Sequence, residues 1–304
     1  MKARLSVVFL LGASTWIRAQ EPAGAQEPAR DWAAIAAAGH AVPDGADPFA
    51  LLVELGELLG SPDPRLRDEL AYGIAAQWIV RQRLLQPEQL RQLARRWRPN
   101  LAHGLGETGT DTVLLRSFSC LALSLIAARD VQQECLSQEE LRALLAAAIA
   151  FLAGERDLRD HDPQLGWIHA TAHTADLLKF LARNPRVDAD GLTAILGAIG
   201  EKLAMPMAGA FRMGEDERLA RAIAAVLLRE SCPPAALNAM LATLEAAVQR
   251  ARTTEPFDPR QFAVEQNVLH CCRTLYALLD LAGELPPHAE RARRSLGDWL
   301  VALG

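Results

Sequence analysis

The chain has 304 residues, of which 50% are hydrophobic, 23% charged and 5% aromatic, and its formal net charge is −5 at pH 7. These apolar and charged fractions are those of a globular protein, so they exclude a disordered or a collagen-like chain. The acidic balance argues against nucleic acid as the main partner, because domains that bind nucleic acid are usually basic.

The first 25 residues have the pattern of an export signal. Lys2 and Arg4 precede an apolar run from Leu5 to Ile17, and small residues such as Ala19 follow it. The run is shorter than the ~20 residues that a membrane-spanning helix needs. We therefore predict a signal peptide over residues 1–25, a periplasmic or extracellular location and no membrane span after cleavage. The alternative is an uncleaved membrane anchor.

Helix signals cover most of the chain after a mobile lead-in that we predict over residues 26–45. Proline after a capping aspartate marks helix starts at Asp47-Pro48 and Asp63-Pro64, and Ser137 with Glu140 forms a capping box. No long segment alternates with period two, so strands are not expected. The predicted helices cover residues 47–60, 64–83, 87–98, 111–129, 138–153, 166–183, 189–204, 216–230, 234–251, 259–281 and 287–303.

The spacing of these helices predicts the architecture. Successive helix pairs begin roughly 40–50 residues apart, which is the spacing of HEAT and armadillo repeats. We predict a single all-α domain over residues 46–304, built as an array of antiparallel helix pairs in an α-α superhelix. A compact helical bundle is the alternative.

The five cysteines are an odd number and contain no C-x-x-C pair, which argues against zinc-ribbon and thioredoxin-like sites. Cys120, Cys271 and Cys272 lie inside apolar helical runs. A free cysteine in such a run behaves as a small core hydrophobe. We therefore favour free thiols over a structural disulfide.

Charged residues interrupt two strongly apolar helices. Asp68 and Glu69 lie near the start of the helix at 64–83, where the helix dipole favours carboxylates. Arg116, in the segment that also holds Ser119, lies within a long apolar run and needs a partner if it is buried. We expect Asp68 or Glu69 to supply that partner through a bidentate bond.

Two histidines and a carboxylate share one face of the helix predicted over residues 166–183. At 100° per residue, His169, His173 and Asp176 lie within about 60° of one another. Such a face can hold a divalent metal or act as a general acid and base, although no H-E-x-x-H motif is present. Histidines hydrogen-bonded to neighbouring carboxylates explain the same pattern, and no cofactor is expected on that interpretation.

Two charged segments flank this helix. Asp157 and Arg159 precede it, and Trp167 stands at its predicted start. Asp216 and Arg218 open a later helix, where acidic residues in the first turn are ordinary. The acidic residues of this second segment could also pair with arginines of the first across a groove.

Several of these segments, in order, resemble one family. The motifs are RDELAY at 67–72, RSFS at 116–119, ERDLR at 155–159, GWIHATAHTAD at 166–176 and EDER at 215–218. They are similar to those of an uncharacterised bacterial family catalogued only as a domain of unknown function, over about residues 50–281. The resemblance implies a helical-repeat fold and one constellation of unusual residues. It supplies no reaction, cofactor or substrate.

Three functions are compatible with these observations. We favour an interaction module that binds an unknown protein, a peptide or a small polar ligand in a concave groove, as helical arrays often do. The alternatives are a hydrolase with a His/His/Asp site, possibly dependent on a metal, and a purely structural helical domain. No nucleophile elbow, phosphate loop or dinucleotide fingerprint is present. The candidate groove residues are Asp68, Glu69, Arg116, Ser119, Asp157, Arg159, Trp167, His169, His173, Asp176, Asp216 and Arg218.

Overall fold

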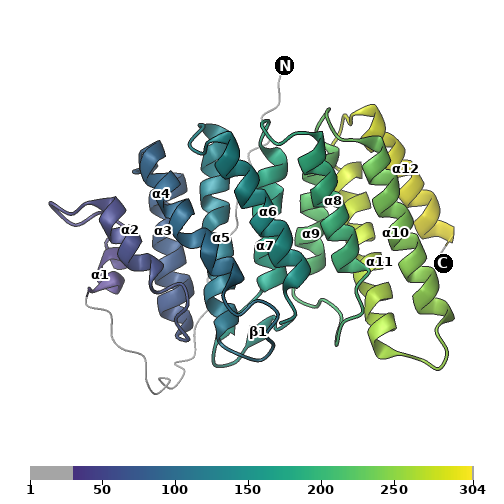
Figure 1. Ribbon diagram of the computed structural model, residues 1–304, viewed down its shortest axis with the longest axis horizontal. Helices are drawn as coiled ribbons and strands as arrows, with labels where there is room; N and C mark the ends of the chain where they lie inside the picture. Colours follow the sequence, from purple (N-terminus) through teal and green to yellow (C-terminus); the bar gives the residue numbers. More distant parts are fainter. Residues whose placement is uncertain (1–29, 303–304) are drawn as a thin grey trace.

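The helices follow one another along an elongated array in the computed structural model, which describes residues 30–302 (Figure 1). The second predicted helix, over residues 64–83, is wound in three parts, with wide π-helical turns at both ends of a short α-helical centre. The described helices are α1 (Trp32–Ala37), α2 (Pro48–Gly56), η1 (Arg65–Tyr72), α3 (Gly73–Ala76), η2 (Gln77–Arg81), α4 (Pro87–Trp97), η3 (Arg98–Ala102), α5 (Thr112–Gln132), α6 (Gln138–Gly154), α7 (Ala170–Arg183), α8 (Ala189–Leu203), α9 (Glu215–Leu227), α10 (Pro234–Thr253), α11 (Pro259–Asp280) and α12 (Pro287–Ala302).

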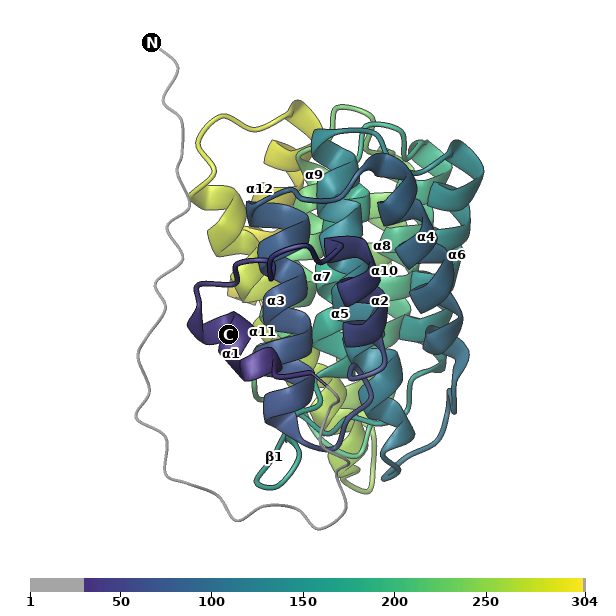
Figure 2. The ribbon, with the colours of Figure 1, turned by 90° about the vertical axis from the view of Figure 1, so that its left-hand side faces the viewer.

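Alternate helices belong to the same layer, and the end-on view in Figure 2 shows the two layers side by side. In one layer α5 packs between η1–α3–η2 and α7, and α9 packs between α7 and α11. The other layer contains α4, α6, α8 and α10, and α12 covers the last helix of the first layer. The prediction of an all-α array of neighbouring helices is therefore confirmed.

Helix α5 is the most deeply buried element of the array. By length and composition it is the one helix, among the residues that the structure describes, that could cross a membrane. Within its most apolar window 89% of the residues are buried inside the fold. A helix that is apolar nearly all round suits a position between neighbours on every side, which is where α5 lies.

The cysteines lie inside this core as free thiols. All five are buried and none forms a disulfide. Burial raises the pKa of the Cys272 thiol to about 12, so it stays protonated and behaves as an apolar group. The preference for core cysteines over a disulfide is confirmed.

A small hairpin replaces the predicted start of α7. Strand β1 (His161–Asp162) pairs antiparallel with β2 (Gly166–Trp167), and α7 begins at Ala170 and not at residue 166. The expectation of no strands was therefore wrong, because strands of two residues are too short to leave a period-two pattern. Gly166 has φ +68°, and a Cβ there would lie 2.7 Å from Cβ of Pro64. The turn therefore requires glycine, both for its backbone conformation and for its close approach to Pro64.

Helix α1 lies within the segment that we predicted as a mobile lead-in. Asp31 caps it by accepting a hydrogen bond from the Ala34 backbone N–H at 2.9 Å. Trp32 and Ile35 are buried against the core, so the packed structure extends ahead of residue 46. The predicted signal peptide at residues 1–25 lies outside the described residues.

A buried ion pair joins α5 to the segment that follows α6. Arg116 Nε lies 2.5 Å from Glu155 Oε2, and Arg116 Nη2 lies 3.1 Å from Glu155 Oε1. Further bonds run from Nη1 to Thr112 Oγ1 at 2.9 Å and from Nη2 to the Glu107 carbonyl at 3.2 Å. Both charged side chains are almost completely buried. The expected partners, Asp68 and Glu69, were wrong because the chain that leaves α6 passes the first turns of α5 and places Glu155 there.

Replacing Arg116 with alanine should lower the free energy of unfolding by about 3–5 kcal/mol, because it leaves the buried Glu155 carboxylate without its counter-charge. The matched control is Arg142→Ala, which removes an exposed pair with Asp188 at 3.4 Å and should cost less than about 1 kcal/mol. Urea unfolding followed by circular dichroism measures both. Equal losses in the two variants would contradict the role assigned to the buried pair.

Candidate functional site

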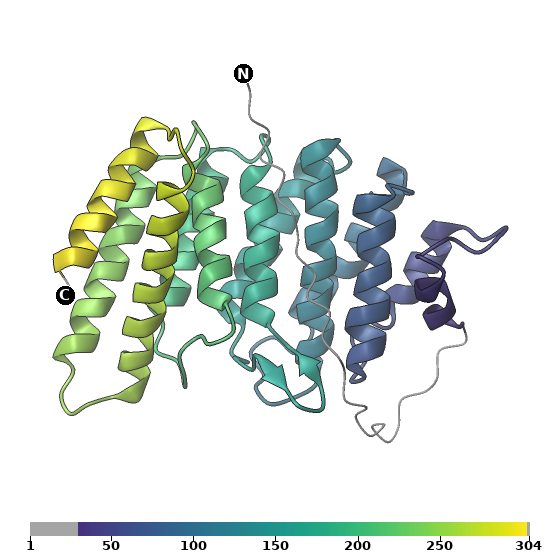
Figure 3. The ribbon, with the colours of Figure 1, turned by 180° about the vertical axis from the view of Figure 1, so that it is seen from behind.

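Most of the candidate residues lie at one end of the layer that contains α5, α7 and α9. Because neighbouring helices in the chain alternate in direction, these three helices run parallel to one another. Figure 3 shows this layer with the hairpin projecting below it, at the end where the three helices begin. The hairpin and the N-terminal turns of α7 and α9 carry most of the unusual side chains.

Trp167 forms the exposed part of this end and covers the buried His169. The indole of Trp167 is 38% exposed. It stacks on the imidazole of His169, with ring centroids 4.4 Å apart and an interplanar angle of 21°. His169 precedes α7 with φ +48°, a left-handed conformation that is uncommon for a non-glycine residue. This backbone conformation helps to place the imidazole beneath the indole.

Glu215 holds His169 from the other side. His169 Nε2 lies 3.3 Å from Glu215 Oε1, and both side chains are buried. The two atoms are within ion-pair distance. They are not aligned for a hydrogen bond, and Nε2 has no other hydrogen-bond acceptor among the described residues. Burial raises the pKa of the Glu215 carboxyl, but the close contact with His169 and hydrogen bonds from backbone N–H groups outweigh it, so the pKa lies below its ordinary value. Glu215 is therefore an anion beneath the Trp167–His169 stack.

His173 has a defined tautomer. The Ser117 hydroxyl donates its one hydrogen to the Ile168 carbonyl at 2.5 Å and lies 2.8 Å from His173 Nδ1. Since the hydroxyl has no second hydrogen, Nδ1 carries the proton and donates it to Ser117. Nε2 is then an unprotonated acceptor, and it has no hydrogen-bond partner within residues 30–302.

The environment of His173 keeps it neutral. Burial lowers its pKa well below the ordinary value near 6.5, and the positive charge of Arg218 lowers it further. The ring also packs edge-on against Phe118, with centroids 5.0 Å apart. His173 is therefore a neutral imidazole within the helix packing.

Asp176 faces cations and not the histidines. Its carboxylate lies 2.6 Å from Lys179 Nζ and 2.8 Å from Arg218 Nη1. Among the residues that the structure describes, no group of three His, Cys, Asp or Glu side chains could hold a metal ion. His173 and Asp176 lie on α7, whereas His169 precedes the helix in a left-handed conformation, and the structure does not arrange the three around a common point.

Asp68 borders the same cluster. Its carboxylate forms no ion pair or hydrogen bond with any residue of the described chain. Burial raises the pKa of this carboxyl, whereas the positive charges of Arg67 and Arg218 oppose the rise. The neighbouring Glu69 is exposed.

The remaining candidates have separate partners. Arg159 Nη2 lies 2.7 Å from Asp157 Oδ2, and the same carboxylate oxygen accepts the Gly109 N–H at 3.0 Å, which ties two loops together. Ser119 accepts a hydrogen bond from Asn100 Nδ2 at 2.9 Å. Asp216 Oδ2 lies 3.9 Å from His270 Nδ1 on α11. None of these residues reaches the Trp167–His169 stack.

Arg67 is an important residue that the list of candidates omitted. It is fully buried and donates to the carbonyls of Ser61, Leu165 and Trp167, the last at 3.0 Å. Its guanidinium also lies over the Phe118 ring, 4.7 Å from the centroid. No carboxylate of the described chain is within ion-pair distance, and burial lowers its pKa to about 10. Arg67 thus holds the hairpin against η1.

The sequence indicated the segments that contain the residues missing from the candidate list, but not the residues themselves. Arg67, Ser117, Glu155 and Glu215 all lie inside the motifs that we singled out. Their partners could not be found from spacing, because each contacts a residue that is distant in the chain.

The neutral state of buried His173 predicts a pH dependence of stability. In the unfolded chain His173 takes up a proton near pH 6.5, whereas in the folded chain its lowered pKa prevents this. The free energy of unfolding should therefore fall as the pH is lowered from 7 to 5, because protons bind preferentially to the unfolded chain. His173→Asn, which retains a donor for Ser117, should reduce this pH-dependent loss.

Urea unfolding at several pH values measures this effect, and the exposed His103 provides the control substitution His103→Asn. An identical pH dependence in the wild type and in His173→Asn would show that His173 does not contribute.

Comparison with known proteins places the chain in a family. A family model described as a protein of unknown function, DUF2785, matches residues 101–277. This match spans more than half of the chain and runs from η3 into α11, so it includes the hairpin and both histidines. Searches against curated proteins and against solved structures found no match. The chain belongs to the DUF2785 family.

Proposed function

We propose that this protein is a helical-array binding module, and that its ligand is a peptide, a segment of a partner protein or a small polar molecule. The proposed contact area consists of the exposed Trp167 and Met213 on the buried pair His169 and Glu215, and we call these four residues the Trp167 surface. The observation that carries the proposal is that the exposed indole of Trp167 stacks on the buried imidazole of His169, which in turn contacts the Glu215 carboxylate.

The two exposed residues of this surface, Trp167 and Met213, both contact the buried His169–Glu215 pair. Met213 is 47% exposed, and its backbone N–H donates to Glu215 Oε2 at 3.0 Å. Trp167 and Met213 are therefore held to the same buried His169–Glu215 pair from two sides. A large aromatic side chain that is already positioned loses little conformational entropy on binding, and tryptophan is enriched among the residues that dominate interfaces.

The surroundings of the Trp167 surface have the polarity of a binding site. The Asp68 carboxylate forms no ion pair within the described chain, and Arg218 is bound to Asp176. A central aromatic contact with a charged periphery is the usual anatomy of a protein interface. The proposal places the ligand on the exposed face formed by Trp167 and Met213 and not in a deep groove.

The other two functions receive less support from the geometry. For a hydrolase, Asp176 is bound to two cations and Nδ1 of His173 is bound to Ser117. For a purely structural domain, the buried pairs are accounted for, but an exposed Trp167 contributes little to the core. A binding function explains both the buried His169–Glu215 pair and the exposed indole that it holds in place.

A peptide that binds the Trp167 surface should lose affinity when the indole is removed. We would select ligands from a random peptide library on the immobilised full chain and measure the enriched peptides by calorimetry. Trp167→Ala should weaken binding about thirtyfold, or about 2 kcal/mol, as expected for a central aromatic residue.

The control for this experiment is Phe257→Ala, which removes an aromatic side chain that is 71% exposed at a different loop. It should leave affinity unchanged. Enriched peptides that bind the wild type and Trp167→Ala equally well would contradict the proposed surface.

We also propose that the protein is exported, on the strength of the basic start and apolar run of residues 1–25. Expression of the full chain in a Gram-negative host should yield a shortened mature protein outside the cytoplasm, detected by fractionation and intact mass. Leu10→Arg should block export, because it places a charge in the apolar run. Leu281→Arg, at a leucine that is 83% exposed, is the control and should be exported normally. A full-length wild type that remains in the cytoplasm would contradict export.

A further inference from the structure

The charges of α7 and α9, which lie side by side in the layer shown in Figure 3, are unevenly distributed. Glu215 and Asp216, the first two residues of α9, are acidic. Apart from these, the two helices carry four cations and only two carboxylates, which are Lys179, Arg183, Arg218 and Arg221 against Asp176 and Glu217. This part of the layer therefore has an excess of two positive charges, on a chain whose net charge is −5.

The side chains meet in two successive contacts across α7 and α9. Asp176, Phe180 and Arg183 share one face of α7, because they follow one another at intervals of four and three residues. The Asp176 carboxylate lies 2.8 Å from Arg218 Nη1, so the first contact joins opposite charges. Farther along, Arg183 lies within electrostatic range of Arg221, whose positive charge helps to lower the pKa of Arg183. The second contact thus brings together two like charges.

Arg183 has hydrogen-bond donors that the fold does not use. Burial lowers the pKa of three described arginines, Arg67, Arg183 and Arg229. Arg67 donates to three backbone carbonyls and Arg229 to four. Arg183 donates to no residue of the described chain and forms no ion pair there, so its five N–H groups are unused. The dipole at the end of α7 favours a cation at this position but does not satisfy those donors.

The guanidinium of Arg183 is both exposed and supported by an aromatic ring. Its central carbon lies 5.7 Å from the ring centroid of Phe180. The ring attracts the cation and reduces the conformational freedom that the side chain loses on binding a ligand. Arg221, in contrast, already bonds to Glu217 at 2.5 Å. Arg183 is therefore the guanidinium of this pair that is available to a ligand.

From this arrangement we infer that Phe180, Arg183 and Arg221, which we call the Arg183 site, bind a glutamate or aspartate side chain of an acidic peptide segment. The carboxylate would accept two parallel hydrogen bonds from Arg183 and would offset the repulsion between Arg183 and Arg221. It would thereby repeat the contact of Asp176 with Arg218 farther along the two helices. A single uncommitted guanidinium matches the one negative charge of a carboxylate better than the two of a phosphate.

The test uses a short, acetylated and amidated peptide in which alanine and glutamate alternate, and the same peptide with glutamine in place of glutamate. Each is titrated at low ionic strength and neutral pH into the ¹⁵N-labelled full chain, and binding is followed by NMR shift changes. We expect saturable binding of the glutamate peptide, with the largest shift changes at the end of α7 and in α9, and no saturable binding of the glutamine peptide. Inorganic phosphate, titrated in the same way, should bind more weakly than the glutamate peptide.

Arg183→Gln should weaken binding of the glutamate peptide about fivefold, as expected for the loss of one solvent-accessible ion pair. Because Arg183 bonds to no residue of the described chain, this variant should fold as the wild type does. The matched control is Arg291→Gln, which removes the same charge from an exposed arginine of α12 that also has no ion pair within residues 30–302. It should bind the glutamate peptide as the wild type does.

The proposal is overturned if the glutamate peptide does not saturate, if the glutamine peptide binds equally well, or if phosphate binds more tightly. Equal affinities of Arg183→Gln and Arg291→Gln would also overturn it, because the effect would then come from the net charge of the chain. Trp167→Ala should leave binding of the glutamate peptide unaltered, since Trp167 is not part of the site. The Arg183 site and the Trp167 surface can therefore fail independently of each other.

Discussion

The buried bond between Arg116 and Glu155 is the constraint on which this end of the molecule depends. Removing two charges from water is costly, and only good geometry with further hydrogen bonds offsets that cost. Here the carboxylate of Glu155 also accepts the backbone N–H groups of Arg156 and Asp157, at 2.9 and 2.8 Å, and its carbonyl accepts Lys202 Nζ at 2.8 Å. One residue thus fixes the start of the segment that leads to the hairpin.

The hairpin is positioned by a second buried arginine that works differently. Arg67 donates to backbone carbonyls on both sides of Gly166, at Leu165 and Trp167, and has no carboxylate partner in the described chain. Together Arg116 and Arg67 hold the segment at its beginning and at its end. The left-handed conformation of His169 then turns the chain into α7, and Trp167 is left exposed on a rigid support.

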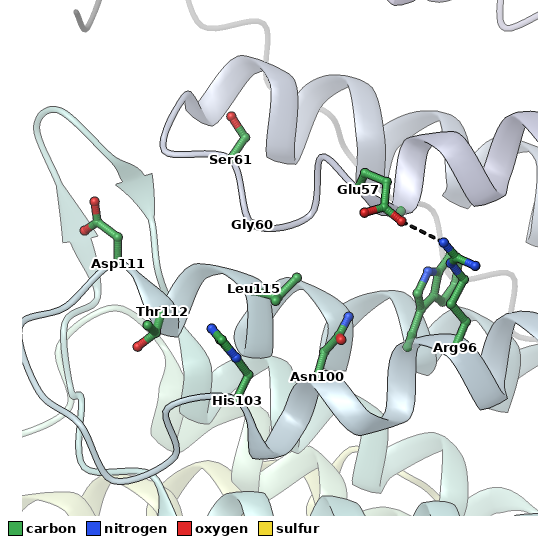
Figure 4. Close-up of a pocket in the computed structure, with 11 residues that line it drawn as sticks. Glu57, Gly60, Ser61, Arg96, Asn100, His103, Asp111, Thr112 and Leu115 are labelled. Carbon is green, nitrogen blue, oxygen red and sulfur yellow. Dashed lines mark hydrogen bonds and ion pairs between the residues drawn. The ribbon is translucent and has the colours of Figure 1, made fainter. Parts of the chain in front are cut away.

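A cavity between the end of α2 and the first turns of α5 (Figure 4) has no residue in common with the Trp167 surface. Thr112 lines the cavity, and its Oγ1 accepts a hydrogen bond from Arg116. Asn100 also lines the cavity and donates to Ser119 on α5, on the same helix as Arg116 and Ser117. Helix α5 therefore lines the cavity with Thr112 and, through the contacts of Ser117 with the Ile168 carbonyl and His173, supports the segment beneath the Trp167 surface.

The sequence by itself determined the helices, because caps, prolines and 3.6-residue periodicity act over a few neighbouring residues. It also indicated the free cysteines and the segments that contain the unusual side chains. Only the tertiary structure decided the partners: Glu155 for Arg116, the cations Lys179 and Arg218 for Asp176, and Ser117 for His173. These contacts depend on the paths of loops between helices, and a loop path is set by packing across the whole array, which no local pattern records.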